Sequence, residues 1–250
     1  SGGFTYLPEA GFIGTDDFRY EVSDGQLAST PVAVTLVVAD PTEQIVINEV
    51  HYDPPDNTIP AEFIERFHVG FEPVDLSNWY FSSGVSYVIP TGTVLQPGEY
   101  LVLAQDPNTL QQEFGVESLG PWIGRLSSDG EDVELRDAAG RRVDLVDYRQ
   151  GFPWPIAAGG DGPSMELIHP ALDNSLGGSW RSALAPTPGA PNSVLATNAP
   201  PQIRQVRHSP QQPASGETTT VTAKVTDPNG VTAVELHYQV VLPGAFIPAL

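Results

Sequence analysis

Gln96-Pro97-Gly98-Glu99-Tyr100-Leu101-Val102-Leu103-Ala104 is the stretch that decides the fold class. Its proline and glycine occupy the two central positions of a type II turn, and residues 100–104 then predict a strand. Outward from this turn, strands are expected at 45–52, 62–69, 133–136 and 143–148. A second turn, at residues 137–140, closes a hairpin between the last two. Short strands separated by such turns predict a β-sandwich or barrel.

One short helix interrupts this pattern. Asp106 is a good N-cap, Pro107 suits the first helical position and Gly115 suits the C-terminal end. Leu110 and Phe114 lie four residues apart, on one helical face. The sequence therefore predicts a helix of one or two turns over residues 107–114.

Composition and charge exclude several classes of function. The 250 residues carry a net charge of −20, and glycine and proline make up about a fifth of them. Such an acidic chain repels nucleic acid and anionic lipid surfaces, and no stretch approaches the roughly 18 apolar residues of a membrane span. The cysteine count of zero excludes disulfides, thiol catalysis and zinc-thiolate sites.

The chain divides into three segments joined by proline-containing linkers. Residues 1–38 predict the last part of a β-sandwich, 39–44 a stiff joint, 45–193 a whole domain, 194–201 a second linker and 202–250 the first part of another module. The net charges of residues 1–44, 45–193 and 194–250 are −6, −14 and 0. In the last segment, residues 221–225 and 234–238 are expected to pair as a hairpin. We expect a piece of a longer protein.

Residues 45–193 resemble the lamin tail domain, an immunoglobulin-like β-sandwich found in nuclear lamins and in many secreted bacterial proteins. The matching motifs follow the family's order along the segment. They are Ile47-Asn48-Glu49-Val50, Glu62-Phe63-Ile64-Glu65, Val74-Asp75-Leu76-Ser77-Asn78-Trp79, Leu95-Gln96-Pro97-Gly98-Glu99-Tyr100, Ser179-Trp180 and Thr187-Pro188-Gly189-Ala190-Pro191-Asn192. At Arg66-Phe67-His68 the chain departs from the Leu-Tyr-Asn usual in that family.

The flanking segments are similar to other β-sandwich families. Residues 1–38 resemble the end of a bacterial cadherin-like repeat, on Gly11-Phe12-Ile13-Gly14-Thr15-Asp16-Asp17-Phe18 and Tyr20-Glu21-Val22-Ser23-Asp24-Gly25. Residues 202–250 look like the start of an immunoglobulin or fibronectin type III module. These resemblances imply an all-β array in a large extracellular or cell-surface protein, with the neighbouring domains as partners and catalysis, where present, in another domain.

Calcium is the ligand that the acidic residues suit best, because it prefers hard oxygen donors. The candidates are Asp16, Asp17 and Asp24 in the first segment and Asp53, Asp56 and Asn57 in the second. None has the spacing of an EF-hand loop. The competing interpretation is that these residues form Asx turns on a solvated surface.

No catalytic constellation is expected. Glu62 and Glu65 point to opposite faces of a strand, so they cannot flank one glycosidic bond. If the face that carries Glu65 is buried, an arginine or several backbone donors must satisfy that carboxylate. The five histidines form no zinc motif, and Ser164 lacks the glycine pattern of a nucleophile elbow.

The tryptophans leave two functions open. Trp79 and Trp180 are expected in the core, whereas Trp122 and Trp154 lie beside prolines in predicted loops. The first hypothesis is a non-catalytic segment that spaces or displays other domains. The alternative is a recognition module that binds an extracellular glycan or a surface protein through Trp122 or Trp154, since exposed tryptophans make good anchors.

Overall fold

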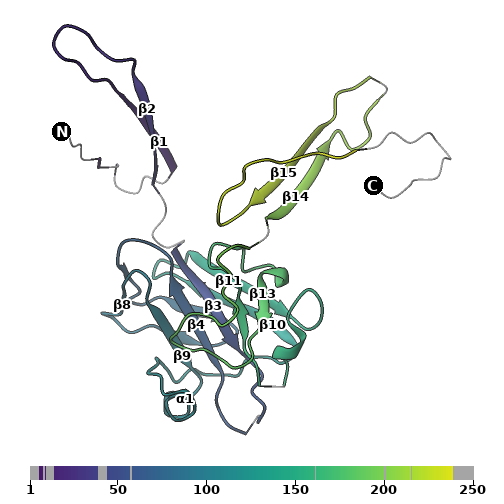
Figure 1. Cartoon of the computed structure of the whole chain (residues 1–250). Coiled ribbons are helices and arrows are strands. Elements are labelled where there is room, and N and C mark those ends of the chain that lie inside the picture. Colours follow the sequence, from purple (N-terminus) through teal and green to yellow (C-terminus); the bar gives the residue numbers. More distant parts are fainter. Residues whose placement is uncertain are drawn as a thin grey trace. The chain divides into compact units, whose positions relative to one another are not determined.

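The computed structural model describes residues 6–7, 9, 14–38, 44–56, 58–160, 162–199, 201–214 and 216–238. It divides the chain into two compact units, residues 1–195 and 196–250. Residues 45–182 hold the strands of a sandwich of two antiparallel sheets (Figure 1). No helix in the described residues is long and apolar enough to cross a membrane.

The larger sheet has five strands in the order β13-β12-β3-β4-β9. Their bounds are β3 Ile45–His51, β4 Phe63–His68, β9 Tyr100–Ala104, β12 Met165–Leu167 and β13 Trp180–Ser182. The first three confirm strands expected from the sequence. β3 lies in the middle of this sheet, so the strand that begins the sandwich is hydrogen-bonded on both sides.

The second sheet has four strands in the order β11-β10-β6-β7, and β5 and β8 form a separate two-stranded ribbon. The bounds are β5 Val74–Asp75, β6 Tyr80–Ser83, β7 Tyr87–Val88, β8 Val94–Leu95, β10 Gly130–Arg136 and β11 Arg142–Arg149. The type II turn before β9 is present, since Gly98 has φ +77° and the N–H of Glu99 bonds the carbonyl of Gln96.

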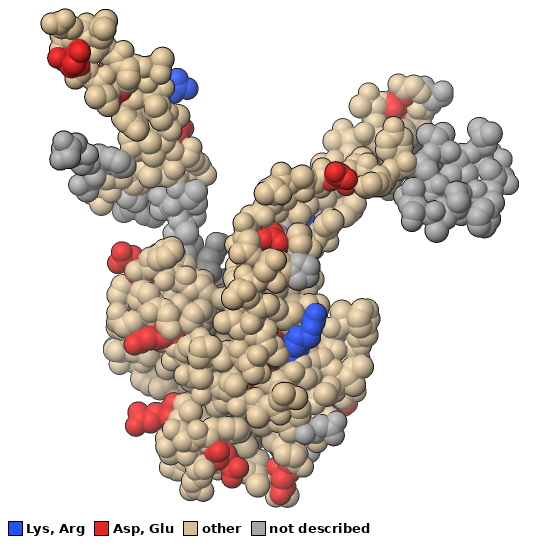
Figure 2. Space-filling view, viewed as in Figure 1, with Lys and Arg blue, Asp and Glu red and all other residues tan. Residues whose placement is uncertain are grey.

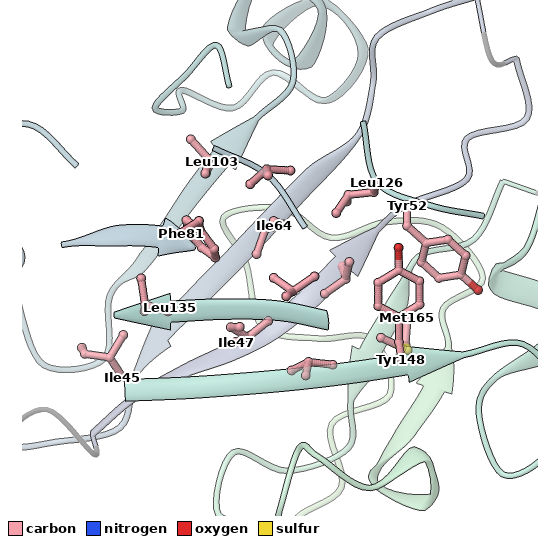
Figure 3. Packing of buried hydrophobic residues seen from close by; sticks show 14 of the residues in the cluster. Ile45, Ile47, Tyr52, Ile64, Phe81, Leu103, Leu126, Leu135, Tyr148 and Met165 are labelled. Carbon is pink, nitrogen blue, oxygen red and sulfur yellow. The ribbon is translucent and has the colours of Figure 1, made fainter. Parts of the chain in front are cut away.

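The main core fills the space between the two sheets (Figure 3). Ile47, Ile64 and Leu103 of the larger sheet face Phe81 and Leu135 of the smaller one, and all are buried. Trp79 and Trp180 also belong to this core, as expected. The all-β, immunoglobulin-like class is confirmed.

The predicted helix is confirmed as α1, Pro107–Phe114. The Asp106 carboxylate accepts the N–H of Thr109 at 2.7 Å, and Gly115 ends the helix at φ +72°. Leu110 packs with Phe63 and Val102 in a smaller cluster on the outer face of the five-stranded sheet. The helix therefore covers one part of that face.

A β-bulge in β3 decides which side chains reach the outer face. The register between β3 and β4 shifts between Ile47 and Glu49, which leaves Asn48 as the extra residue. A bulge reverses the alternation of side chains along a strand. Ile47 and Val50 therefore both face the main core, while Glu49 faces outward. The freed N–H of Ile47 donates to the Asp144 carboxylate at 2.6 Å.

Each flanking segment contains one two-stranded hairpin. β1 (Gly14–Tyr20) pairs with β2 (Val32–Val38), as a β-rich first segment requires. β14 (Gln202–Ser209) pairs with β15 (Thr220–Thr226). The predicted pairing of 221–225 with 234–238 was wrong, because β15 uses β14 as its partner and residues 231–238 form no strand.

Candidate functional site

Three glutamates lie side by side across the outer face of the five-stranded sheet. Glu49 of β3 is in register with Glu166 of β12 on one side and with Glu65 of β4 on the other. All three side chains are fully buried. Like charges directly opposite each other destabilise a sheet, and a buried carboxylate needs donors or a counter-ion. We call these three residues the glutamate row.

The segment that follows β13 supplies donors to the row. We call residues 183–195 the strap. Each glutamate accepts one backbone N–H from it, in the pairs Thr187 to Glu49 (2.9 Å), Gly189 to Glu65 (2.5 Å) and Val194 to Glu166 (3.0 Å). The strap therefore presents its backbone donors to the carboxylates, much as a helix N-terminus presents its own to an anion.

Side-chain donors add to these backbone contacts. Glu166 accepts the hydroxyls of Thr187 (2.7 Å) and Ser193 (2.8 Å), and Glu49 accepts the hydroxyl of Ser164. No arginine or lysine forms a salt bridge with the row among the described residues. The carboxylates are thus satisfied by neutral donors rather than by counter-ions.

Two asparagines join the first strand of the sandwich to the strap. The Asn48 amide donates to the Asn192 side-chain oxygen at 2.7 Å and to Glu65 at 2.9 Å. The Asn192 amide donates in return to the backbone carbonyls of Asn48 (3.0 Å) and Leu167 (2.8 Å). Because both asparagines are buried, these hydrogen bonds are shielded from competing water.

Burial shifts two of the carboxyl pKa values strongly. Loss of solvation raises the pKa of Glu49 to about 7, with the charge of Glu166 adding to the shift and the hydroxyl of Ser164 opposing it. Loss of solvation likewise raises the pKa of Glu65 to about 8, with the charges of Glu49 and Glu166 adding to it. The row therefore binds protons near neutral pH that the unfolded chain releases.

The row cannot carry out acid–base chemistry on a substrate, since its oxygens face the strap and are closed to solvent. Glu62, on the opposite face of β4 from Glu65, accepts the Arg125 guanidinium (2.9 Å) and the N–H of Leu126 (2.8 Å). The sequence-based expectation that the two glutamates point apart and need donors is confirmed.

The calcium candidates do not converge where the structure describes them. Asp24 and Asp56 each accept the backbone N–H of the residue two positions ahead, which is the geometry of an Asx turn. The Asp16 carboxylate accepts the Tyr6 hydroxyl at 2.9 Å, and Asp17 lies next to it in β1. Asn57 lies outside the described residues. Among the residues that are described, no three acidic or histidine side chains form a metal-binding group.

The two loop tryptophans are not exposed. Trp122 and Trp154 are 6% and 9% exposed and both belong to the main core. The Trp154 ring lies against Gly177, and the Trp122 indole N–H donates to the carbonyl of Gly124 at 3.2 Å. The expected exposure of these two rings was wrong, because a proline-rich loop can turn a large apolar side chain inward as readily as outward. Ligand binding through these loops stays a prediction.

Sequence reasoning missed Glu49, Glu166 and Asn192 as one cluster. Two of the motifs that carried the resemblance, Ile47-Asn48-Glu49-Val50 and Thr187-Pro188-Gly189-Ala190-Pro191-Asn192, contain its central members. The signal was present, but the bulge at Asn48 that brings them together leaves no mark in the alternation of residue types.

Two comparisons with known families match this chain. Residues 39–150 match the family model of the lamin tail domain, and residues 1–37 match that of the bacterial Ig domain. The first segment, expected to resemble the end of a cadherin-like repeat, thus matches an immunoglobulin-like family. β12 and β13 follow the matched region yet complete the same sheet, and the strap that covers it follows them. A search of curated proteins found no match.

Proposed function

Because the chain carries a lamin tail domain preceded by a bacterial Ig domain, we propose that it is a non-catalytic segment that spaces and displays other domains of a large extracellular or cell-surface protein. Ig-like families of this kind are generally non-catalytic, and bacterial Ig domains often occur in extracellular proteins. Its partners are then the neighbouring domains of the same chain.

One observation carries this proposal. The strand that begins the sandwich, β3, is hydrogen-bonded directly to the strap with which the sandwich ends, through Asn48 to Asn192 and Glu49 to Thr187. Tension applied between residues 44 and 196 would load these bonds together rather than peel strands one at a time. A spacer that has to keep its length benefits from such a direct path.

Single-molecule stretching of the full chain between two marker domains tests this role. We expect the 45–195 sandwich to unfold in one event, and Asn192→Ala to lower the unfolding force because it removes bonds worth roughly 3 kcal/mol together. Leu184→Ala is the matched control, since Leu184 lies on the same strap with its side chain in solvent. An unchanged force in Asn192→Ala contradicts the proposal, as does turnover of any substrate in a broad hydrolase panel.

A further inference from the structure

The loop between β11 and β12 exposes two large apolar side chains. Phe152 is 94% exposed and Ile156 is 74% exposed, whereas Trp154 between them is buried. We call residues 151–158 the apolar loop. Single apolar residues on a surface need no explanation, but two of them on one short loop mark a candidate contact surface.

The backbone of the apolar loop is fixed by the buried side chains of Trp154 and Ala158. The N–H of Trp154 bonds the carbonyl of Gly151 at 2.9 Å, and the Trp154 ring packs so closely on Gly177 that a Cβ there would come within 2.9 Å of it. Ala158, at the end of a short 3₁₀ helix (Ile156–Ala158), is also in the core. The two exposed side chains are therefore presented from a fixed backbone, which lowers the entropy lost on binding.

A cavity of about 490 Å³ opens beside the loop. Its lining includes Pro155, Ile156 and Gly159 from the loop side and Tyr52 from the end of β3. The Tyr52 ring stacks on Tyr148 with 4.6 Å between ring centroids, at one end of the main core (Figure 3). A second cavity, of about 400 Å³, shares Tyr52 and is lined also by Asp53 and Glu62. The two cavities therefore adjoin at Tyr52.

Asp53 lies at this junction, and Glu62 and Arg125, which form a salt bridge with each other, line the second cavity with it. It is only 9% exposed, and its carboxylate has no hydrogen bond or salt bridge to any described residue. Its Oδ2 atom faces the glycines that follow the loop, 3.3 Å from where a Cβ of Gly160 would lie. A carboxylate that lines a cavity without a partner favours a cation brought by a ligand.

We propose that the apolar loop and the adjoining cavities bind an extended segment of a partner protein, in which an aliphatic residue lies next to an arginine or lysine. The aliphatic side chain contacts Phe152 and Ile156, and the cationic group reaches Asp53. The net charge of −14 over residues 45–193 favours such a basic segment, and acidic side chains outnumber basic ones on the drawn face (Figure 2). This recognition is additional to the spacing role.

The probe is a blocked pentapeptide with a central arginine between two leucines, titrated into the full isotope-labelled chain and followed by NMR. We expect amide shifts at residues 52–53 and 150–159, with an affinity that weakens as salt is added. A second peptide with glutamate in place of the arginine is expected to give no shifts there.

Matched variants separate the two parts of the surface. Asp53→Asn should weaken binding by about tenfold, since a charge-assisted contact contributes about 1.5 kcal/mol. Phe152→Ser should weaken it several-fold without changing the fold, because the side chain is in solvent. Glu117→Gln and Phe71→Ser are the controls: both are exposed, and Phe71 follows the far end of β4 from Glu62.

Four results of these titrations overturn the proposal. They are no shifts at the solubility limit of the arginine peptide, equal binding of the glutamate peptide, unchanged affinity in Asp53→Asn, and calcium alone shifting the same amides and blocking the peptide. Self-association that disappears in Phe152→Ser also overturns it, because the loop would then be an interface between two copies of this chain.

Discussion

Both faces of strand β4 carry buried ionisable side chains, but only those on the outer face have their hydrogen bonds satisfied. On the outer face, Glu65 and the other members of the glutamate row accept hydrogen bonds from the strap. On the inner face, Arg66 is fully buried in the main core, with one bond from Nη2 to the carbonyl of Leu101 at 3.2 Å. Its Nε and Nη1 have no hydrogen-bond partner in the described part of the chain.

The difference shows which buried charge holds the fold together. The glutamates organise a covering segment that has no strand pairing of its own, so their loss would free the strap. Arg66 lies over the Phe81 ring, 5.2 Å from its centroid, but its Nε and Nη1 form no hydrogen bond with the described residues. Buried charge is thus a structural link on one face and a net cost on the other.

The largest effect is expected from Glu49→Leu. This change leaves the N–H of Thr187 and the hydroxyl of Ser164 without their acceptor in a buried site. Unpaired buried donors of this kind cost about 1–3 kcal/mol each, so we expect the free energy of unfolding to fall by about 4 kcal/mol. Urea denaturation at constant m-value measures this.

The control for this change is Glu117→Leu, which removes an exposed carboxylate from outside the row. It is expected to alter the free energy of unfolding by less than about 0.5 kcal/mol. A Glu49→Leu protein as stable as the unaltered chain would mean that the strap is held by its own packing and not by the row.

The second effect concerns pH. The raised pKa values of Glu49 (about 7) and Glu65 (about 8) mean that the folded chain binds more protons than the unfolded one above pH 4.5. Stability is therefore greatest in mild acid and is lost as the pH rises through these values. We expect the free energy of unfolding to fall by several kcal/mol between pH 5 and pH 8, since each pKa unit is worth about 1.4 kcal/mol.

Urea titrations of Glu65→Gln at the same two pH values sharpen this expectation. The glutamine cannot ionise, so the loss between pH 5 and pH 8 should shrink, whereas the exposed control Glu117→Gln should keep it. Stability that instead increases from pH 5 to pH 8 would show that the row stays ionised throughout and that donors from the strap outweigh burial.

Much of the fold could be predicted from the sequence because it rests on local signals. The Pro97-Gly98 turn and the Asp106 cap each have a short-range physical cause, and the structure has both. The pairing of β15 was not predicted, because its partner is β14, the strand before it in the chain, whereas the expected partner, residues 234–238, forms no strand.

The candidate site was harder to foresee than the fold. The requirement that Glu65 find donors followed from strand alternation, but their source did not. Asn48 and Asn192 are separated by more than a hundred residues and meet because the bulge at Asn48 turns its side chain outward together with that of Glu49. Likewise, nothing local distinguishes the buried Trp154 from the exposed Phe152 two residues earlier.

The smallest effect, and the only stabilising one, is expected from Arg66→Met. Burial lowers the pKa of Arg66 to about 10, which reflects the loss of solvation that its contacts do not restore. An unbranched apolar side chain of similar length fills the same space without unpaired donors. Replacing a buried charge in this way stabilises proteins by about 1–4 kcal/mol, and we expect about 2 kcal/mol from urea denaturation at pH 5.

The effect of Arg66→Met should depend on the ionisation of Glu65 on the opposite face of β4. Glu65 is next to Arg66 in the chain, and its ionised form favours the charged guanidinium. Removing that charge should therefore stabilise the protein less at pH 8, where the glutamate row ionises, than at pH 5. The exposed Arg142→Met should change stability by less than about 0.5 kcal/mol at either pH. A destabilised Arg66→Met at both pH values would show that the contacts with Phe81 and Leu101 outweigh the two unpaired donors.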